Sequence, residues 1–420
     1  MNIVKELVGL CGIARDNAPT ESEAFCYELL GRQYQKIDEA VEEKKGNFAI
    51  VSCYSPMELL HAMDILPLTT LLHAAITSMV RPCQDFLDAV TGYGVPVDIC
   101  SMHRTAAGMA IAGAFPTPDF IIGTSEVCDP EIKTTEVIAR ILNRPNFYLE
   151  QVASYDVIHP HHWYNEGVVA YYKKELGALV GFIEKQTGKN LDIDRLREVI
   201  KLSNEAAALY REVSRLREHV PTPVRNVEFF YHCLIYSLFA GTKEAVDYFN
   251  LCLKDAREVV EGKRSLPYKE KHRISWLFCL PCYSMDLFNW MEKEHGVVIP
   301  VDMVNYWTGD EEEMDPSDPI DAIARKGYWA PLAAVYIGPG EKWSERAVEL
   351  SQKGKVEAAV IMNNYNCKEG CFILRLIRDT VQERLGIPVK IIDADVIDPS
   401  LAPPDSLKDE LEGFFETLEE

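Results

Sequence analysis

The sequence contains no run of about 18 apolar residues, the length that a membrane-spanning helix requires. It is also short of basic side chains, because 43 Lys and Arg stand against 65 Asp and Glu and leave a formal net charge of -22. Surfaces that bind nucleic acid need a clustered excess of Lys and Arg. We therefore expect neither a membrane span nor a nucleic-acid-binding role, and an anionic ligand would need a local basic patch.

Motifs that hold nucleotide phosphates are missing too. Neither a G-x-G-x-x-G nor a G-x-x-x-x-G-K-[ST] element follows any apolar run. The sequence also shows no clear internal repeat and no low-complexity tract. Any ATP chemistry that the protein depends on would have to come from another chain.

Cysteine is too sparse for a secreted disulfide scaffold, with 12 in 420 residues. The first residues, Met1 to Lys5, do not lead into the apolar segment of a signal peptide. We therefore expect a cytoplasmic protein with reduced thiols. In that setting, spaced cysteines more often indicate a metal site or catalysis than cross-links.

What is present is an alternation of short apolar, β-branched runs with helical periodicity. It predicts an α/β fold of two Rossmann-like, doubly wound parallel-sheet units with helical additions. We divide the chain into a helical segment at 1–45, a first α/β unit at 46–160, a helical region at 161–270 and a second α/β unit at 271–420, whose acidic tail is expected to be a solvated helix. The expected strands are 48–54, 97–100, 120–123, 147–149, 273–279, 296–299, 358–362 and 389–393.

One strand-to-helix turn carries two polar side chains of interest. Ser55-Pro56-Met57-Glu58 has the Ser-x-x-Glu spacing of a capping box, with proline at the expected first helical position. A cap would fully explain Glu58. The alternative is a carboxylate at the carboxyl end of a strand, where parallel sheets keep their ligands.

Three cysteines follow apolar runs in the same way. Cys100, Cys128 and Cys367 each stand between an expected strand and an expected helix. Each could be a small buried hydrophobic residue, because free cysteine is among the most buried residue types. Their spacing matches no compact ferredoxin motif, so spacing alone does not establish a cluster.

The residues around these cysteines resemble the 2-hydroxyacyl-CoA dehydratase and benzoyl-CoA reductase family, in the form of the larger (alpha) dehydratase subunit. The similar segments are Cys100-Ser101-Met102-His103-Arg104, then 118–122 leading to Cys128-Asp129 and Lys133, and Asn366-Cys367-Lys368 followed by 385–388 and 393–395. Residues 275–289 fit the family as well, so the resemblance spans nearly the whole chain.

The resemblance implies a [4Fe-4S] cluster held by Cys100, Cys128 and Cys367, with one iron that lacks a cysteine ligand. An open coordination position lets a substrate oxygen or water bind, whereas a fully ligated site can only pass electrons. Glu58 resembles a carboxylate that the family keeps near the cluster, and we take Glu58 and Ser55 as catalytic candidates.

The implied reaction removes water from an (R)-2-hydroxyacyl-CoA to give a 2-enoyl-CoA. The β proton of such a thioester is not acidic enough for a side-chain base. Family chemistry adds one electron to the thioester, so that a ketyl radical anion expels hydroxide and its β proton becomes acidic, and the electron is returned at the end. The implied partners are a related smaller (beta) subunit and a separate ATP-dependent iron-sulfur activator protein, and activity should be oxygen-sensitive.

Several alternatives remain open. The chain could belong to a reductase of benzoyl-CoA type, or to one with a double-cubane cluster that recruits the spare cysteines Cys53, Cys282 and Cys371. It could instead be a non-catalytic electron carrier or a zinc-stabilised subunit, with Cys279 and Cys282 paired with Cys367 and Cys371. His159, His161 and His162 are weaker metal candidates, and Arg104 is expected in a surface ion pair rather than on a CoA phosphate.

Overall fold

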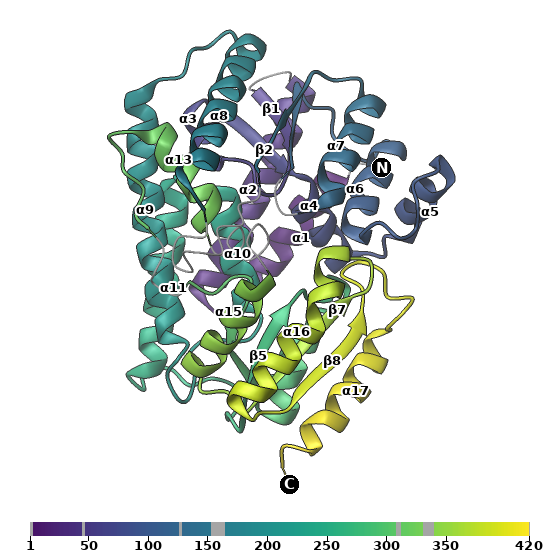
Figure 1. Cartoon of the computed structure of the whole chain (residues 1–420), viewed down its shortest axis with the longest axis vertical. Coiled ribbons are helices and arrows are strands. Elements are labelled where there is room, and N and C mark those ends of the chain that lie inside the picture. The colour runs from purple at the N-terminus through teal and green to yellow at the C-terminus, as the bar shows by residue number, and fades with distance from the viewer. Residues whose placement is uncertain are drawn as a thin grey trace.

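The computed structural model describes residues 3–43, 47–125, 128–152, 164–307, 312–330 and 340–419. Its strands form two four-stranded sheets with the orders β2-β1-β3-β4 and β6-β5-β7-β8, and every described pairing is parallel. Figure 1 shows the sheet with β1 and β2 in the upper part of the molecule and the sheet with β5, β7 and β8 in the lower part. The predicted α/β class with two parallel-sheet units is confirmed. The strands are β1 (Asn47–Val51), β2 (Ile65–Thr69), β3 (Phe120–Thr124), β4 (Asn146–Leu149), β5 (His272–Phe278), β6 (Val297–Asp302), β7 (Ala358–Asn364) and β8 (Val389–Ala394).

Two strand predictions need correction. The expected strand at 97–100 does not form, and these residues lie in turns that lead into a helix. The fourth strand of the first sheet is instead β2, which contains Pro67. Proline has no backbone N–H to donate to a neighbouring strand, so it is disfavoured in a central strand that pairs on both sides. The edge strand β2 pairs on one side only and therefore tolerates Pro67.

Helices cover both sheets and fill the middle of the chain. The helical character predicted for 1–45 and for 165–260 is confirmed, while the domain boundaries stay a prediction. No helix in the described part of the chain is both long and apolar enough to cross a bilayer. The helices are α1 (Ile3–Asp16), α2 (Glu21–Glu43), α3 (Met57–Ala62), α4 (Thr70–Val80), α5 (Gln84–Tyr93), α6 (Ser101–Ile111), α7 (Asp129–Leu142), α8 (Glu166–Thr187), α9 (Ile193–Leu216), α10 (Glu228–Phe239), α11 (Lys243–Val260), η1 (Cys282–Ser284), α12 (Asp286–Trp290), the π-helical η2 (Met291–His295), α13 (Pro319–Trp329), α15 (Gly340–Lys353), α16 (Lys368–Leu385) and α17 (Pro404–Glu416).

The two sheets share a core on one face and have separate cores on the other. Successive strand residues point to opposite faces, so Phe48 and Ile50 of β1 join the same large cluster as Trp276 of β5. Ala49 and Val51 face a second cluster with α3, α8, α9 and α13. The continuous core fixes the carboxyl ends of both sheets relative to one another.

The acidic C-terminal tail forms the predicted helix, α17, but it is not fully solvated. Its side chains Leu407, Leu411 and Phe415 are buried in the shared core. Helical spacing places these three residues on one face, while the charged residues occupy the other. The tail is thus an amphipathic helix that packs against the second sheet unit.

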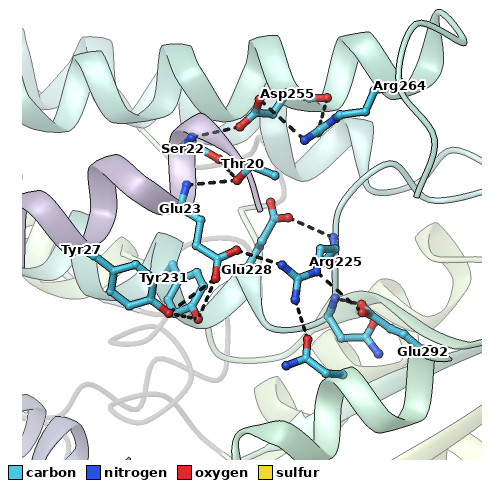
Figure 2. A network of polar contacts seen from close by, with 12 residues as sticks. Thr20, Ser22, Glu23, Tyr27, Arg225, Glu228, Tyr231, Asp255, Arg264 and Glu292 are labelled. Carbon is cyan, nitrogen blue, oxygen red and sulfur yellow. Dashed lines mark hydrogen bonds and ion pairs between the residues drawn. The ribbon is translucent and has the colours of Figure 1, made fainter. Parts of the chain in front are cut away.

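A buried polar network joins the N-terminal helices to the middle of the chain (Figure 2). The Arg225 guanidinium donates to Glu23 of α2 at 2.9 Å and lies 3.9 Å from a carboxylate oxygen of Glu292. Glu228 of α10 accepts from the Arg225 backbone N–H at 3.4 Å. Arg225 therefore contacts three carboxylates, Glu23 and Glu292 through its guanidinium and Glu228 through its backbone N–H, and this clustering of charges affects how stability depends on pH.

Candidate functional site

Three of the predicted site residues occupy the same structural position. Cys100, Cys128 and Cys367 are the N-cap residues of α6, α7 and α16. Two of these helices follow the carboxyl ends of β3 and β7, where parallel sheets place their ligands. Helix N-termini carry partial positive charge, which favours the thiolate form that binds metal.

The three thiols also lie near one another. Burial raises the pKa of Cys128 well above its ordinary value, and the charges of Cys367 and Cys100 raise it further. Burial and the charge of Cys100 likewise raise the pKa of Cys367. The two sheet units meet here, because the Asp129 backbone N–H donates to the Glu369 carboxylate at 2.9 Å.

Asp395, at the end of β8, ties together the turns that carry two of these thiols. Its carboxylate is fully buried and accepts hydrogen bonds from Ser101, which follows Cys100, and from Asn366, which precedes Cys367, the latter at 3.4 Å. It also accepts from the backbone N–H groups of Ile397 and Asp398 at 2.7 and 2.8 Å. The first sheet's helix α6 is thereby fixed to the second sheet's β8.

The donor set fits an iron-sulfur cluster better than a single ion. Among the described residues, no group of three or more His, Cys, Asp or Glu side chains converges to hold one metal ion. Cluster ligands bind different iron atoms, so their sulfurs need not converge on one point. Here neighbouring thiolates raise one another's pKa, because their negative charges repel. Cationic iron would offset this repulsion.

Glu58 and Ser55 do not form the predicted capping box, and that prediction is wrong. Helix α3 has Pro56 as its N-cap and no side-chain cap. The Ser55 backbone N–H donates to the Ser52 carbonyl at 3.2 Å, and the Ser55 hydroxyl has no described hydrogen-bond partner. Neither side chain caps the helix. Both instead line a cavity of about 140 Å³.

Glu58 forms a buried ion pair inside this cavity. Its carboxylate accepts from the Lys326 ammonium and, at 2.6 Å, from the Ser203 hydroxyl. Burial alone would raise the pKa of Glu58, but the Lys326 charge and these hydrogen bonds outweigh it and lower the pKa. The Lys326 ammonium also lies 4.9 Å from the centre of the Tyr236 ring. Glu58 is therefore a carboxylate held in its ionised form in a mostly apolar space.

Tyr54 is one residue of the cavity that is influenced by a candidate ligand thiol. It lines the cavity, and burial together with the charges of Cys53, Cys128 and Cys233 raises the pKa of its phenol. A second hydroxyl, that of Tyr210, lines the cavity without a described hydrogen-bond partner. Buried polar atoms are normally paired, so the free hydroxyls of Ser55 and Tyr210 are available to a ligand.

The other cysteine candidates separate into different surroundings. Burial and the charges of Cys367 and Cys100 raise the pKa of Cys279, so two of the three candidate ligands act on this thiol. Cys53 lines the cavity instead. Cys371 is half-buried and donates to the Asn363 side chain at 3.1 Å.

The prediction for Arg104 is wrong, and the prediction for three histidines stays untested. Arg104 is not in a surface ion pair, because its side chain is buried and donates to the Thr91 hydroxyl at 2.8 Å. The histidines His159, His161 and His162 lie outside the described residues.

Sequence reasoning gave no role to Lys326 or Asp395, and it considered Cys279 only for a zinc pair. Lys326 lies 268 positions from Glu58, so no local pattern links them. Asp395 stands in a segment that resembles the family, and its position directly after an apolar strand was an available signal.

Comparison with known proteins identifies the family. The family described as 2-hydroxyglutaryl-CoA dehydratase, D-component, matches residues 52–418. The chain is 24% identical to the (R)-2-hydroxyisocaproyl-CoA dehydratase alpha subunit of Clostridioides difficile, over 95% of this chain and 97% of that one. It is 24% identical to the (R)-phenyllactyl-CoA dehydratase alpha subunit of Clostridium sporogenes, over 86% and 87%, and 22% identical to one subunit of the benzoyl-CoA reductase of Thauera aromatica, over 96% and 98%. Since the match spans most of its length, the chain belongs to the 2-hydroxyglutaryl-CoA dehydratase D-component family, as the motifs around its cysteines predicted.

Proposed function

We propose that this chain is the iron-sulfur subunit of an (R)-2-hydroxyacyl-CoA dehydratase, a lyase that forms a 2-enoyl-CoA and water. The observation that carries the proposal is the position of Cys100, Cys128 and Cys367 at three helix N-termini. A cavity that holds Glu58 supports it, because that cavity is also lined by Tyr54, whose pKa responds to the charge of Cys128. The relatives named as alpha subunits support a companion beta subunit.

Cys100, Cys128 and Cys367 would hold a [4Fe-4S] cluster. When bound, the cluster would supply one electron at low potential and one coordination position without a cysteine ligand. The chain's own residues then bind and orient the acyl group. Ser55 offers a free hydroxyl for a thioester or 2-hydroxyl oxygen, and Glu58 offers an ionised carboxylate that can accept the β proton once the thioester carries an extra electron.

The donated electron must come from outside this chain, because the sequence has no phosphate-binding loop for ATP. We propose a separate ATP-dependent iron-sulfur activator as its source. The chain alone should therefore neither hydrolyse ATP nor turn over a hydroxyacyl-CoA. Activity should appear when the companion subunit and the activator are added under anaerobic conditions, and ATP hydrolysis by the isolated chain would contradict the proposal.

The decisive experiment is iron analysis of anaerobically purified protein. We expect brown protein with about four iron atoms per chain, and lower iron content in Cys100→Ala, Cys128→Ala and Cys367→Ala. Cys11→Ala is the matched control, because Cys11 is buried in the shared core with the N-terminal helices. Colourless protein with stoichiometric zinc would reject the cluster and favour the structural zinc alternative.

A reductase of benzoyl-CoA type is the second candidate. Two observations favour it, namely the similarity to one subunit of the benzoyl-CoA reductase of Thauera aromatica and a fourth thiol, Cys279, whose pKa is raised by the charges of Cys367 and Cys100. A larger double-cubane cluster would need such extra thiolates. About eight irons per chain, a loss of iron in Cys279→Ala, and net consumption of electrons during turnover would identify this alternative.

A further inference from the structure

The cavity around Glu58 and Lys326 is small and mostly walled by apolar side chains. Its volume is about 140 Å³, and Met57, Ile323 and Trp307 are among the residues that line it. A cavity of roughly this size, about 150 Å³, is known to accept benzene. The space can therefore hold a single ring or a branched alkyl chain, but not the CoA moiety.

The charges in the cavity are already balanced. Lys326 is the single Lys or Arg among the described residues that line it, and its ammonium is paired with Glu58. A carboxylate on an incoming ligand would put a second negative charge beside Glu58. The Lys326 ammonium would then be the single positive charge on the described lining residues available to pair with two carboxylates. Burying an unpaired charge in this way is strongly unfavourable.

We propose that this cavity receives the acyl side chain of the substrate, and that this side chain is uncharged and apolar, between a branched alkyl chain and a phenyl group in size. The inference rests on the proposed function, because it takes the ligand to be a 2-hydroxyacyl-CoA. The free hydroxyls of Ser55 and Tyr210 provide polar contacts for the oxygens next to that side chain. An acyl chain ending in a second carboxylate, as in 2-hydroxyglutaryl-CoA, is rejected.

Binding measurements test this selectivity without turnover. The anaerobic complex with its companion subunit, without activator, is titrated calorimetrically with free CoA and three esters, 2-hydroxy-3-phenylpropanoyl-CoA, 2-hydroxy-4-methylpentanoyl-CoA and 2-hydroxyglutaryl-CoA. We expect both apolar esters to bind about 100-fold more tightly than the glutaryl ester. Equal or tighter binding of the glutaryl ester overturns the inference and leaves the proposed function standing. If no ester binds more tightly than free CoA, the proposed function itself fails.

A substitution that fills the cavity tests its location. Ala330 lines the cavity, so Ala330→Leu should weaken binding of the phenyl ester about tenfold or more and leave that of 2-hydroxypropanoyl-CoA nearly unchanged. Ala40→Leu is the control, because Ala40 is a similarly half-buried alanine on α2 that does not line the cavity. Both esters should bind the control variant like the unmodified protein. Equal effects of Ala330→Leu on both esters, or no effect, would place the acyl side chain elsewhere.

Discussion

Glu58 and Lys326 show how single residues keep charge inside an apolar site. The exposed fractions of their side chains are 2% and 14%, so each charge depends on the other rather than on water. Removing one partner leaves the other uncompensated, whereas removing both can be nearly neutral. The pair can therefore be tested as a unit.

Lys326→Met should destabilise the protein by about 3–5 kcal/mol, because Glu58 would lose its cation in a buried site. The double variant with Glu58→Gln should recover most of that loss, which denaturant unfolding can measure as a double-mutant cycle. Lys173→Met is the control. Its ammonium pairs with Asp318 at 2.7 Å on the surface, so the change should cost less than about 1 kcal/mol. Equal costs for the two lysine variants would contradict a buried pair.

Asp395 offers a second test at the scale of one residue. Asp395→Ala removes the acceptor for Ser101 and Asn366, so the turns that carry Cys100 and Cys367 lose their common anchor. We expect reduced iron content and faster labelling of the two thiols by an alkylating reagent in metal-free protein. Asp398→Ala is the control, because the Asp398 carboxylate accepts from the backbone N–H of Ser400 at 2.9 Å, on the surface. Unchanged iron content and labelling in Asp395→Ala would remove the anchoring role.

At the scale of elements, the crossing of α5 and α6 controls where Cys100 lies. A Cβ atom on Gly108 of α6 would lie 2.1 Å from the Phe86 carbonyl oxygen of α5, so the helices are in backbone contact at this point. Because Cys100 caps α6, a change in the crossing would move its thiol.

Gly108→Ala should therefore destabilise the protein and lower its iron content, although alanine is the better helix former by about 1 kcal/mol. Gly177→Ala in α8 is the matched control. Nothing lies within 4 Å of a Cβ added there, so this change should stabilise the protein by about 0.5–1 kcal/mol. Thermal unfolding and iron analysis of both variants measure the difference. A stabilised Gly108→Ala with full iron content would show that the contact relaxes easily.

Local sequence patterns predicted most helices and strands. They failed where contacts between segments distant in the sequence determine the structure. Strands such as β7 were predictable, because a continuous apolar run is typical of a strand buried on both faces. The missed β2 depends on its place at the sheet edge, where Pro67 is tolerated. The run at 97–100 looks like a strand but finds no partner in a sheet. Edge position and pairing are properties of the assembled sheet, so no local pattern reports them.

The same limit applies to the site at the scale of the whole molecule. Cys100, Cys128 and Cys367 were identifiable as candidates because each lies just before a helix and within a segment that resembles the family. The Ser55 and Glu58 spacing misled, because a local cap competes with Lys326, which only the folded chain brings near. Folding therefore brings together charged residues that are distant in the sequence, such as Glu58 and Lys326 in the cavity and Glu23 and Arg225 in the buried network. These pairs determine the chemistry of the cavity and the response of the protein to pH.

The network around Arg225 makes the whole molecule sensitive to alkaline pH (Figure 2). Burial raises the pKa of Glu228 to about 8 and that of Glu292 to about 7, although the Arg225 charge opposes both shifts. The charges of Glu23 and Asp255 add to the shift of Glu228. Both side chains ordinarily titrate near 4.5, so the folded state holds protons that the unfolded state releases. Their stabilising contribution is present below about pH 4.5 and is lost as pH rises through 7 to 8.

We therefore expect the free energy of unfolding to fall by a few kcal/mol between about pH 6 and pH 9, measured by urea titration of the metal-free chain at fixed ionic strength. Glu228→Gln should flatten this decline and be more stable than the unmodified protein at pH 9, because an amide keeps the hydrogen-bond acceptor without the charge. Glu212→Gln is the control, because the Glu212 carboxylate pairs with Arg257 on the surface, where screening makes the pair weak. A decline that persists unchanged in Glu228→Gln would show that the alkaline loss comes from elsewhere, with the self-repulsion of a chain of net charge -22 as the next cause to test.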